Sequence, residues 1–384
     1  MTRAFHGAPF DEATLLKLDI FRGYIRSWLP VFLSKRSYPN VNIFDFFAGP
    51  GRDINGQSGY PLVIIDEVSR YFLDESFQKA PQASVTLYFN DSESENIQQL
   101  KNNVEDILKD RDPGYNIRFE NDDFETAFFK ELPFLKRSDT ANLVILDQFG
   151  LKQINDRIFD KLISCSATDI LFFISSSYIK RFITEGSIRK YFPFSEDEIK
   201  EISPKDIHRY ICREFYRKRI PKSLDYFLSP FSIQKDHSAN IYGLIFGSGK
   251  LLGLQKFLEV CWNKDQVTGE ANYNIDNDSI RTGQLSLFPE DNVIKKQDRF
   301  EKDMVRYIKE KKPTNKDLYR FCLENGFLPR HVTEILRELQ QSSHLEVKDP
   351  VSNDDVRKGA FYISWENYKK PYPRARFSWM EADK

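Results

Sequence analysis

A nine-residue stretch near the N-terminus constrains the fold of this chain more than any other feature. It reads Ile43-Phe44-Asp45-Phe46-Phe47-Ala48-Gly49-Pro50-Gly51. Apolar residues that end in a carboxylate and a Gly-Pro-Gly turn are typical of the first strand of a doubly wound α/β sheet, because glycine lets the backbone approach a ligand closely. The dinucleotide-binding fingerprint has a third glycine and opens directly into a helix, whereas residues 52–61 continue as a glycine-rich loop. The stretch therefore favours S-adenosylmethionine over a dinucleotide as ligand.

Four further apolar segments have the length of buried strands, at residues 85–89, 116–119, 143–146 and 170–174. Helical spacing separates them at residues 93–108 and 126–135, and an amphipathic helix at residues 11–33 precedes the first strand. Alternating strands and helices predict a mostly parallel, Rossmann-like sheet with helices on both faces. Three of the strands end at acidic residues, namely Asp91, the pair Asp122 and Asp123, and Asp147. We expect these carboxylates to line one crevice at the carboxyl edge of the sheet.

Changes in composition divide the chain. Residues 1–262 form the predicted sheet domain, and residues 180–222 are a basic helical insertion with 12 Lys/Arg against 7 Asp/Glu. Residues 263–294 are polar and predict a linker. Residues 295–370 predict a winged-helix domain. Its expected elements are three helices at residues 300–310, 313–323 and 329–341, followed by strands at residues 345–348 and 360–365.

Composition excludes several classes of protein. The four cysteines, Cys165, Cys212, Cys261 and Cys322, are far apart in the 384 residues and form no Cys-x-x-Cys pair. A metal site or a disulfide framework is therefore not expected, and a reducing, cytoplasmic location fits. No apolar run approaches the roughly 18 residues that span a membrane. From residue 295 onward there are 20 Lys/Arg against 15 Asp/Glu, which suggests an acidic partner for this part of the chain.

Several motifs together resemble the three-Cys-motif partner family of class I methyltransferase-like proteins. The matching segments are Trp28-Leu29-Pro30, Asp45 through Arg52, Phe89-Asn90-Asp91, Leu146-Asp147-Gln148-Phe149-Gly150 and residues 241–262. The family motif at the fourth strand usually reads Asp-Pro-Phe-Gly, and Gln148 replaces its proline. The resemblance implies a class I methyltransferase fold, S-adenosylmethionine as cofactor and a three-cysteine, radical-SAM-like protein as partner.

The resemblance also implies roles for the residues at the strand ends. Gly49 and Gly51 would approach the methionine part of the cofactor beside Phe47, and Asp45 would organise its ammonium group. Asp91 would accept the ribose hydroxyls, since a carboxylate offers two acceptor oxygens; the alternative is that it caps the helix at residues 93–108. Asp122 or Asp123 would take the adenine amino group, with Phe124 stacking on the ring, and a capping role is open for them too. These residues form the expected cofactor site.

Asp147 is the expected catalytic residue, together with Gln148 and Phe149. Methyl transfer is an in-line displacement, so the protein mainly aligns the acceptor and excludes water. A carboxylate beside the methyl group accepts a hydrogen bond from an amine or hydroxyl acceptor, and Phe149 would stack on a flat substrate such as a base. The alternative is that Asp147 only closes the cofactor pocket.

Two sets of arginines are expected at a nucleic-acid interface. Arg209, Arg213, Arg217 and Arg219 in the insertion would follow phosphates, unless they are a solvated helix face. Arg330 and Arg337 lie on the third helix of the winged-helix domain, the element that enters a major groove in such domains. Winged helices also dock proteins, which leaves the partner of this domain open.

One pentapeptide in the predicted linker resembles the peptide that docks bacterial DNA-processing proteins on the sliding clamp. It reads Gln284-Leu285-Ser286-Leu287-Phe288. Leu and Phe anchors of an extended peptide fill apolar pockets, so Gln284, Leu285, Leu287 and Phe288 are the expected contacts. The alternative is that the apolar residues fold back onto the protein itself.

The sequence thus leads to two hypotheses. The first is a methyltransferase that uses S-adenosylmethionine on nucleic acid, together with the three-Cys partner. The second is a scaffold, with or without bound cofactor, that recruits partner proteins to DNA. Intact Asp45, Gly49, Gly51, Asp91 and Asp147 favour the first, and the altered Asp-Gln-Phe-Gly motif favours the second.

Overall fold

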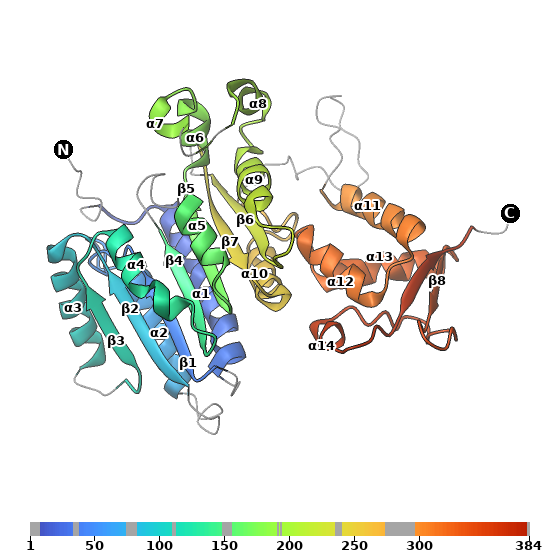
Figure 1. Ribbon diagram of the computed structural model, residues 1–384, viewed down its shortest axis with the longest axis horizontal. Coiled ribbons are helices and arrows are strands. Elements are labelled where there is room, and N and C mark those ends of the chain that lie inside the picture. The colour runs from blue at the N-terminus through green and yellow to red at the C-terminus, as the bar shows by residue number, and fades with distance from the viewer. Residues whose placement is uncertain are drawn as a thin grey trace. The chain divides into compact units, whose positions relative to one another are not determined.

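The computed structural model describes residues 8–33, 38–73, 83–109, 113–147, 156–189, 192, 194–234, 240–272 and 296–381. The chain divides into two compact units, Met1–Val260 and Cys261–Lys384. The first unit appears in blue to yellow in Figure 1 and the second mainly in orange and red. Each unit is considered by itself below.

The first unit is built on a seven-stranded sheet with the order β3-β2-β1-β4-β5-β7-β6. Its strands are β1 (Asn40–Asp45), β2 (Ser84–Asn90), β3 (Asn116–Glu120), β4 (Thr140–Leu146), β5 (Thr168–Ile174), β6 (Phe227–Gln234) and β7 (Ile241–Ser248). The first five strands are parallel, and β7 runs antiparallel to both of its neighbours. The order β3-β2-β1-β4-β5 is that of a doubly wound Rossmann sheet, so the predicted fold class is confirmed.

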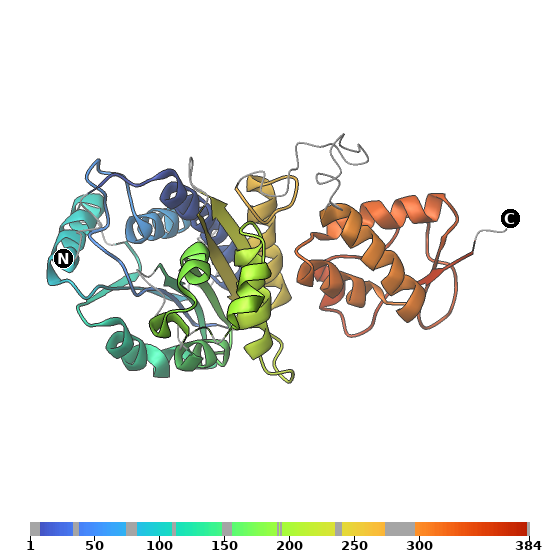
Figure 2. The ribbon, with the colours of Figure 1, turned by 90° about the horizontal axis from the view of Figure 1, so that it is seen from above.

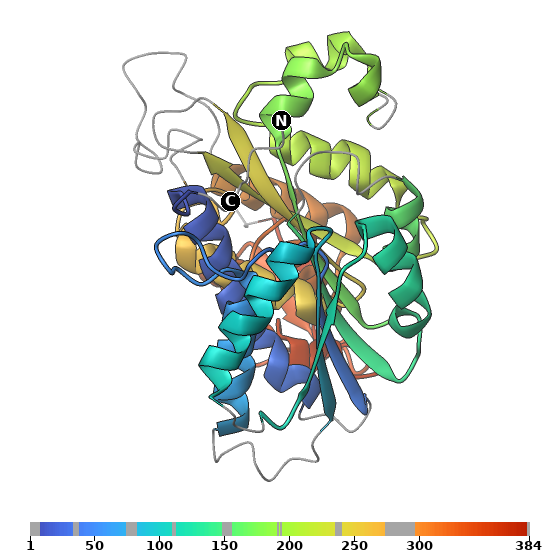
Figure 3. The same cartoon turned by 90° about the vertical axis from the view of Figure 1, so that its left-hand side faces the viewer.

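Helices cover both faces of this sheet, as Figures 2 and 3 show. One face carries α1 (Glu12–Leu33), α2 (Tyr60–Leu73), α3 (Ser94–Leu108) and α10 (Leu251–Lys264); the other carries α4 (Phe124–Leu135), α5 (Asp156–Ile163) and the π-helix η2 (Ile211–Arg217). Strands covered on both faces are apolar along their whole length, and all seven residues of β4 are buried. This explains why the strands read in the sequence as short apolar runs without alternation.

Strand β6 was not predicted from the sequence. It contains Pro230, and a proline usually argues against a strand because it cannot donate to the ladder. Among the described strands it lies at the edge of the sheet and pairs with β7 alone, and a missing donor is tolerated at an edge. Between β5 and β6 the chain forms α6 (Ser176–Phe182), α7 (Gly186–Arg189), α8 (Glu196–Glu201) and α9 (Ile207–Tyr210) before η2, so the described part of residues 180–222 is mainly helical, as expected.

A buried carboxylate anchors α1 to the sheet. Asp169 of β5 accepts hydrogen bonds from the Tyr24 hydroxyl at 2.7 Å and from the Trp28 indole nitrogen at 3.0 Å. Burial raises the pKa of Asp169 to about 6, against the opposing effect of its hydrogen bonds from Ser248, Tyr24 and Trp28. These hydrogen bonds hold α1 against β5 at Tyr24 and Trp28. The N-terminal end of the helix lies two or more turns before Tyr24.

The second unit contains the predicted winged helix. Its elements are α11 (Lys296–Lys311), α12 (Asn315–Glu324), α13 (Pro329–Gln341), β8 (Leu345–Lys348), α14 (Trp365–Tyr368) and β9 (Arg376–Trp379). The three long helices and β8 lie where the sequence predicted them. The predicted second strand at residues 360–365 is wrong, because β8 pairs with β9. Apolar alternation at Phe361 and Ile363 reflects burial of both side chains without a paired neighbour strand.

The return of the wing depends on Asn315 at the start of α12. This side chain is fully buried. Its Oδ1 accepts from the backbone N–H groups of Arg374 and Ala375 at 2.8 and 3.3 Å, and its Nδ2 donates to the Tyr362 carbonyl at 3.1 Å. The domain therefore extends past the predicted boundary at residue 370 and includes β9.

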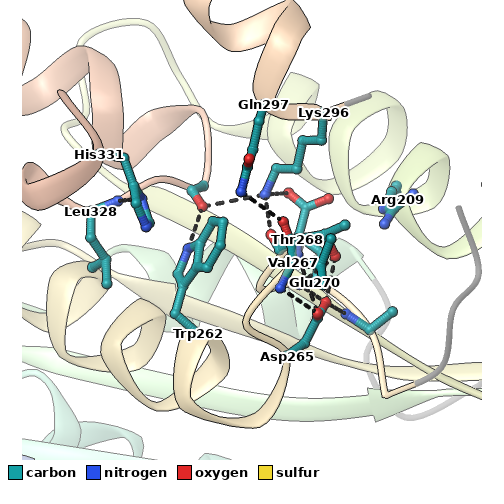
Figure 4. Close-up of polar contacts among 12 residues, drawn as sticks. Arg209, Trp262, Asp265, Val267, Thr268, Glu270, Lys296, Gln297, Leu328 and His331 are labelled. Atoms are coloured by element: carbon teal, nitrogen blue, oxygen red, sulfur yellow. Dashed lines mark hydrogen bonds and ion pairs between the residues drawn. The ribbon is translucent and has the colours of Figure 1, made fainter. Parts of the chain in front are cut away.

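The predicted linker at residues 263–294 is shorter than expected at its N-terminal end. Helix α10 continues to Lys264, and Asp265 then accepts hydrogen bonds from Val267 and Thr268 (Figure 4). Across the segment 273–295, Lys296 donates to the Thr268 carbonyl at 2.6 Å and pairs with Glu270 at 3.0 Å. Residues 263–272 thus belong to the second unit. The pentapeptide Gln284–Phe288 lies outside the described residues.

The Asp169 anchor gives the first prediction. In Asp169→Ala the single oxygen Oδ2 that accepts from both Tyr24 and Trp28 is removed, so these two buried donors lose their partner. An unsatisfied buried donor costs about 1–3 kcal/mol. We expect the free energy of unfolding in urea to fall by that amount, and Asp160→Asn on the exposed side of α5 to stay within about 0.5 kcal/mol. Equal stability of the two variants would contradict the anchor.

Candidate functional site

The turn after β1 has the backbone conformation that its glycines predicted. Gly49 and Gly51 have φ of 61° and 85°, values that favour glycine. A Cβ atom at position 51 would lie 2.6 Å from Cδ1 of Leu100. The Gly49 N–H donates to Asp91 at 2.9 Å, and the Asn103 amide donates to the Pro50 carbonyl at 2.8 Å. The turn is therefore fixed before any ligand binds.

Asp45 ends β1 directly before this turn. Its side chain is fully buried, and Oδ1 accepts from the Phe47 N–H at 3.1 Å. Oδ2 has no hydrogen-bond partner among the described residues. Burial raises the pKa of Asp45 to about 8, assisted by the charges of Asp147 and Asp91 and opposed by the Phe47 hydrogen bond. A buried polar atom without a partner is rare, and this one is a ready acceptor for a cationic or N–H-bearing ligand.

Asp147 follows β4, the strand beside β1, and it is paired. Lys17 of α1 donates to both of its oxygens, at 2.8 and 2.6 Å. The same ammonium lies 4.0 Å from the centroid of the Phe173 ring on β5. Burial, and then the charges of Asp147 and Asp45, raise the pKa of the Tyr60 hydroxyl at the start of α2. The structure therefore brings Asp45 and Asp147 into one cluster, as predicted, and adds Lys17 and Tyr60 to it.

Lys17 was missed in the sequence, although a signal was present. The residues of α1 that face the protein are apolar at helical spacing, and Lys17 falls on that stripe one turn before Phe21 and two turns before Tyr24. A lysine on an apolar stripe is almost never buried unless it has a partner. The sequence could therefore have indicated a buried carboxylate opposite α1.

Asp91 has the position predicted for it, after β2, but its oxygens already hold partners. Oδ1 accepts from the Glu93 N–H at 2.9 Å and from the Asn96 amide at 3.0 Å, and Oδ2 accepts from Gly49. The capping alternative thus describes Oδ1. Because a carboxylate oxygen accepts two hydrogen bonds, Oδ2 retains capacity for one more donor, such as a ribose hydroxyl.

The residues after β3 divide into different roles. Asp123 is the N-cap of α4 and accepts from the Thr126 N–H at 3.1 Å. Asp122 is half-buried and lies 3.5 Å from the Lys130 ammonium. The Phe124 ring is buried against Phe47, with centroids 4.9 Å apart. The geometry favours a capping role for Asp123 and leaves Asp122 as the acceptor at this strand end.

Two polar side chains that the sequence did not single out organise the loops. Asn90, fully buried, donates to the carbonyls of Phe46 at 3.3 Å and Asp122 at 3.0 Å, and it thereby ties together the loops after β1, β2 and β3. Asp53 accepts from the backbone N–H groups of Phe10, Asn55 and Gln57 at 2.8 to 2.9 Å. These bonds shape the loop at residues 52–59 and attach the segment before α1 to it.

The predicted arginine set in the insertion is only partly exposed. Arg209 is 9% exposed and pairs with Asp206, so burial removes it from the expected phosphate-binding row. Arg213 and Arg217 are exposed, and Arg219 lies over the Phe215 ring at 4.6 Å. Arg330 and Arg337 on α13 are both exposed. Gln148 and Phe149 lie outside the described residues.

Two absences apply to the described part of the chain. No group of three or more His, Cys, Asp or Glu side chains there could hold a metal ion. No helix among the described residues is long and apolar enough to cross a membrane.

Comparisons with known proteins agree with the second unit most directly. A family model described as a GMT-like wHTH domain matches residues 272–352, which covers the three helices and β8 of the winged helix. No curated protein matches the chain. Because the family model matches only this C-terminal part, the fold of the first unit is identified from its own strand order.

Solved structures similar to the chain are distant. The methyltransferase domain of bacterial CtHen1-C is 11% identical with a TM-score of 0.30, and the comparison covers 59% of this chain and 96% of that one. CrArsM, an arsenic(III) S-adenosylmethionine methyltransferase from Chlamydomonas reinhardtii, is 14% identical with a TM-score of 0.28 and coverage of 55% and 64%. The chain itself shows a Rossmann-like sheet in its first unit and a winged helix in its second.

The raised pKa of Asp45 gives the second prediction. The folded state keeps a proton on this carboxyl up to about pH 8, whereas the unfolded chain releases it near pH 4. Asp45 therefore weakens the folded state progressively as pH rises from about 4 to about 8. Asp45→Asn removes this effect, so its stability relative to the natural protein should increase across that range, by on the order of a few kcal/mol.

Urea unfolding at several pH values between 4.5 and 8.5 measures this difference. Asp160→Asn, an exposed carboxyl on α5, is the control and should show no trend with pH. A stability difference for Asp45→Asn that does not change with pH would show that Asp45 is ionised in the folded protein throughout.

Proposed function

We propose that the chain is a methyltransferase that uses S-adenosylmethionine and acts on nucleic acid presented by its winged helix. The observation that carries the proposal is the free Oδ2 of buried Asp45 beside the turn at Gly49 and Gly51. The cofactor is a cation, with an amino group and a sulfonium. It supplies an activated methyl group.

The residues at the strand ends fit this cofactor. Asp45 would accept from its amino group, which gives Oδ2 the partner that the described residues do not supply. Gly49 and Gly51 are buried and carry no side chain that would separate a ligand from the backbone of the turn, and Oδ2 of Asp91 has capacity for a ribose hydroxyl. Asp122 is the remaining acceptor for the adenine amino group. The ring of Phe47 is half-buried and borders the same turn.

We assign Asp147 to binding the substrate group that receives the methyl. It follows the strand next to Asp45, so a group bound to its oxygens lies beside the cofactor site. Its carboxylate would accept a hydrogen bond from the atom that receives the methyl group and would hold that atom in line with the methyl group. Such positioning supplies much of the rate of a methyl transfer. Burial of Lys17 and Tyr60 around it keeps water out of this side.

Nucleic acid as substrate is supported by the winged helix. Arg330 and Arg337 are exposed on α13, the element that lies in the major groove in related domains. Arg213 and Arg217 offer further positive charge in the first unit. A three-cysteine, radical-SAM-like partner, implied by the family resemblance, and a sliding clamp that binds Gln284–Phe288 complete the proposal as separate hypotheses.

Two observations favour the scaffold alternative. Both oxygens of Asp147 accept from Lys17 in the free protein, and Gln148 replaces the proline of the family motif. A protein that binds cofactor for stability and recruits partners to DNA would tolerate both features. The alternative predicts cofactor binding without methyl transfer, so the two functions separate at the transfer step.

The third prediction tests the cofactor site. Because Asp45 must lose its proton to bind a cation, the affinity for S-adenosylmethionine should rise with pH by up to about tenfold per unit from pH 5.5 to 7, a range in which the cofactor's amino group stays charged. Calorimetric titration in two buffers of different ionisation enthalpy should show release of close to one proton per cofactor.

Asp45→Asn should bind about 10- to 100-fold more weakly at pH 7 and lose the pH dependence. Asp160→Asn is the control and should match the natural protein. No detectable binding by the folded natural protein would end the cofactor assignment. Binding that is equally tight in Asp45→Asn would assign the cation to another residue.

The fourth prediction tests the winged helix. Replacing Arg330 and Arg337 together with Ala should weaken binding to double-stranded DNA and reduce the slope of log affinity against log salt by about 2, because each arginine displaces about one counterion. Arg306→Ala on α11, where the side chain is exposed and pairs with Asp303, is the matched control. Unchanged affinity and slope in the double variant would remove α13 from the interface.

A further inference from the structure

The pair of Lys17 and Asp147 shows which chemical group can bind at Asp147, the residue proposed to bind the methyl-accepting substrate. The Lys17 ammonium donates to both carboxylate oxygens, at 2.8 and 2.6 Å, and it lies over the Phe173 ring at 4.0 Å. An amino nitrogen is thus bound by two acceptors and an aromatic face. Asp147 follows β4, which pairs with β1, so this contact lies at the same edge of the sheet as Asp45.

Lys17 reaches this position from an element that is fixed elsewhere. Tyr24 and Trp28 attach α1 to Asp169 at the start of β5, and Phe173 lies near the other end of the same strand. The Lys17 side chain is only 9% exposed and that of Asp147 18% exposed. A lysine is rarely buried in this way, and among the described residues Asp147 and Phe173 compensate its burial here.

We propose that Asp147 and Phe173 form a subsite for the amino group of a nucleobase, and that Lys17 occupies it in the free protein until the substrate displaces it. This inference rests on the proposed function, and it adds the class of acceptor atom. The acceptor nitrogen would donate its N–H groups to Asp147, and the ring of the base would lie against Phe173, which is half-buried and stacks on Tyr242 at 5.9 Å.

The charges of Asp147 and Asp45 disfavour other chemical groups as the methyl acceptor. A carboxylate only accepts hydrogen bonds, so an atom without an N–H or O–H group gains nothing at Asp147. A phosphate would be repelled by Asp147 and Asp45 together. An amino group offers two donors for the two oxygens and places a positive edge toward the Phe173 face. A hydroxyl offers only one donor for the two oxygens.

The alternative is that Lys17 and Asp147 are a permanent structural ion pair. The two accounts differ in what happens when the lysine is removed. A structural pair leaves behind an uncompensated buried charge and no binding site. A displaceable pair leaves behind a site that takes an added amine, and that difference can be measured without methyl transfer.

The test uses Lys17→Ala and n-propylammonium chloride, which has the size and charge of the missing part of the side chain. Tenfold excess over the dissociation constant should raise the melting temperature of Lys17→Ala by a few degrees. Sodium chloride and n-propanol at equal concentration should not. The natural protein, whose subsite is filled, and the double variant Lys17→Ala/Asp147→Asn should not respond. A response equal in all three proteins, or in none, overturns the subsite.

A second variant covers the case in which Lys17→Ala does not fold. Lys17→Met keeps a stem of the same length and removes only the ammonium group, so the ammonium ion is then the matching probe. It should stabilise Lys17→Met and not Lys17→Met/Asp147→Asn. No difference between these two variants overturns the proposal.

The source of the amino group is distinguished with Lys17→Ala and two nucleosides. Cytidine and uridine differ mainly in an amino group that uridine replaces with a carbonyl, and we expect cytidine to stabilise the variant more than uridine does. Nα-acetyl-lysine methylamide is the competing probe. Stabilisation by the lysine derivative without discrimination between the nucleosides overturns the nucleobase assignment. Calorimetry with S-adenosylmethionine is a separate measurement, so loss of the cofactor hypothesis would be recognised independently.

Discussion

Asp45 places a carboxylate in a position where it is fully buried and has one oxygen without a partner among the described residues. Burial opposes its ionisation, and the neighbouring charge of Asp147 opposes it further. Such a residue lowers the stability of the free protein at neutral pH. The fixed turn at Gly49–Gly51 follows Asp45 closely in the chain. Asp91 holds this turn through Gly49, and Asp53 holds the loop after it. The simplest physical reason to retain this cost is a cationic ligand that removes it on binding.

Helix α1 supplies the second constraint. Its contacts with Asp169 fix it against β5, and the same helix carries Lys17 to the carboxyl end of the sheet. The anchored helix thereby brings Lys17 to Asp147, whereas Asp45 has no paired cation among the described residues. In the free protein, Asp45 on the cofactor side therefore has an oxygen without a partner among the described residues. Asp147, on the side proposed for the methyl-accepting substrate, is already paired with Lys17.

The sequence predicted the elements whose local pattern agreed with their tertiary role. The β1 turn, the acidic strand ends and the helices of the winged helix could be read because apolar runs, glycines and caps are local signals. Strand β6 was missed because Pro230 is tolerated only at an edge, which depends on sheet position. The second wing strand was misplaced because Phe361 and Ile363 alternate for burial and not for pairing.

Site residues were harder to predict than elements. Asp45 and Asp147 could be found from strand ends, but Lys17 is 130 residues from its partner, and only three-dimensional packing shows that they meet. The caps at Asp91 and Asp123 were open alternatives in the sequence, since the same residue types serve helix ends and ligands. Arg209 illustrates the reverse case, because a basic run does not reveal which of its members is buried.

Transfer of a labelled methyl group from S-adenosylmethionine to nucleic acid tests the central claim most directly. The account predicts incorporation into DNA or RNA by the natural protein and none by Asp147→Asn, with cofactor binding retained in that variant. Cofactor binding without incorporation into either nucleic acid, or incorporation that persists in Asp147→Asn, would contradict it.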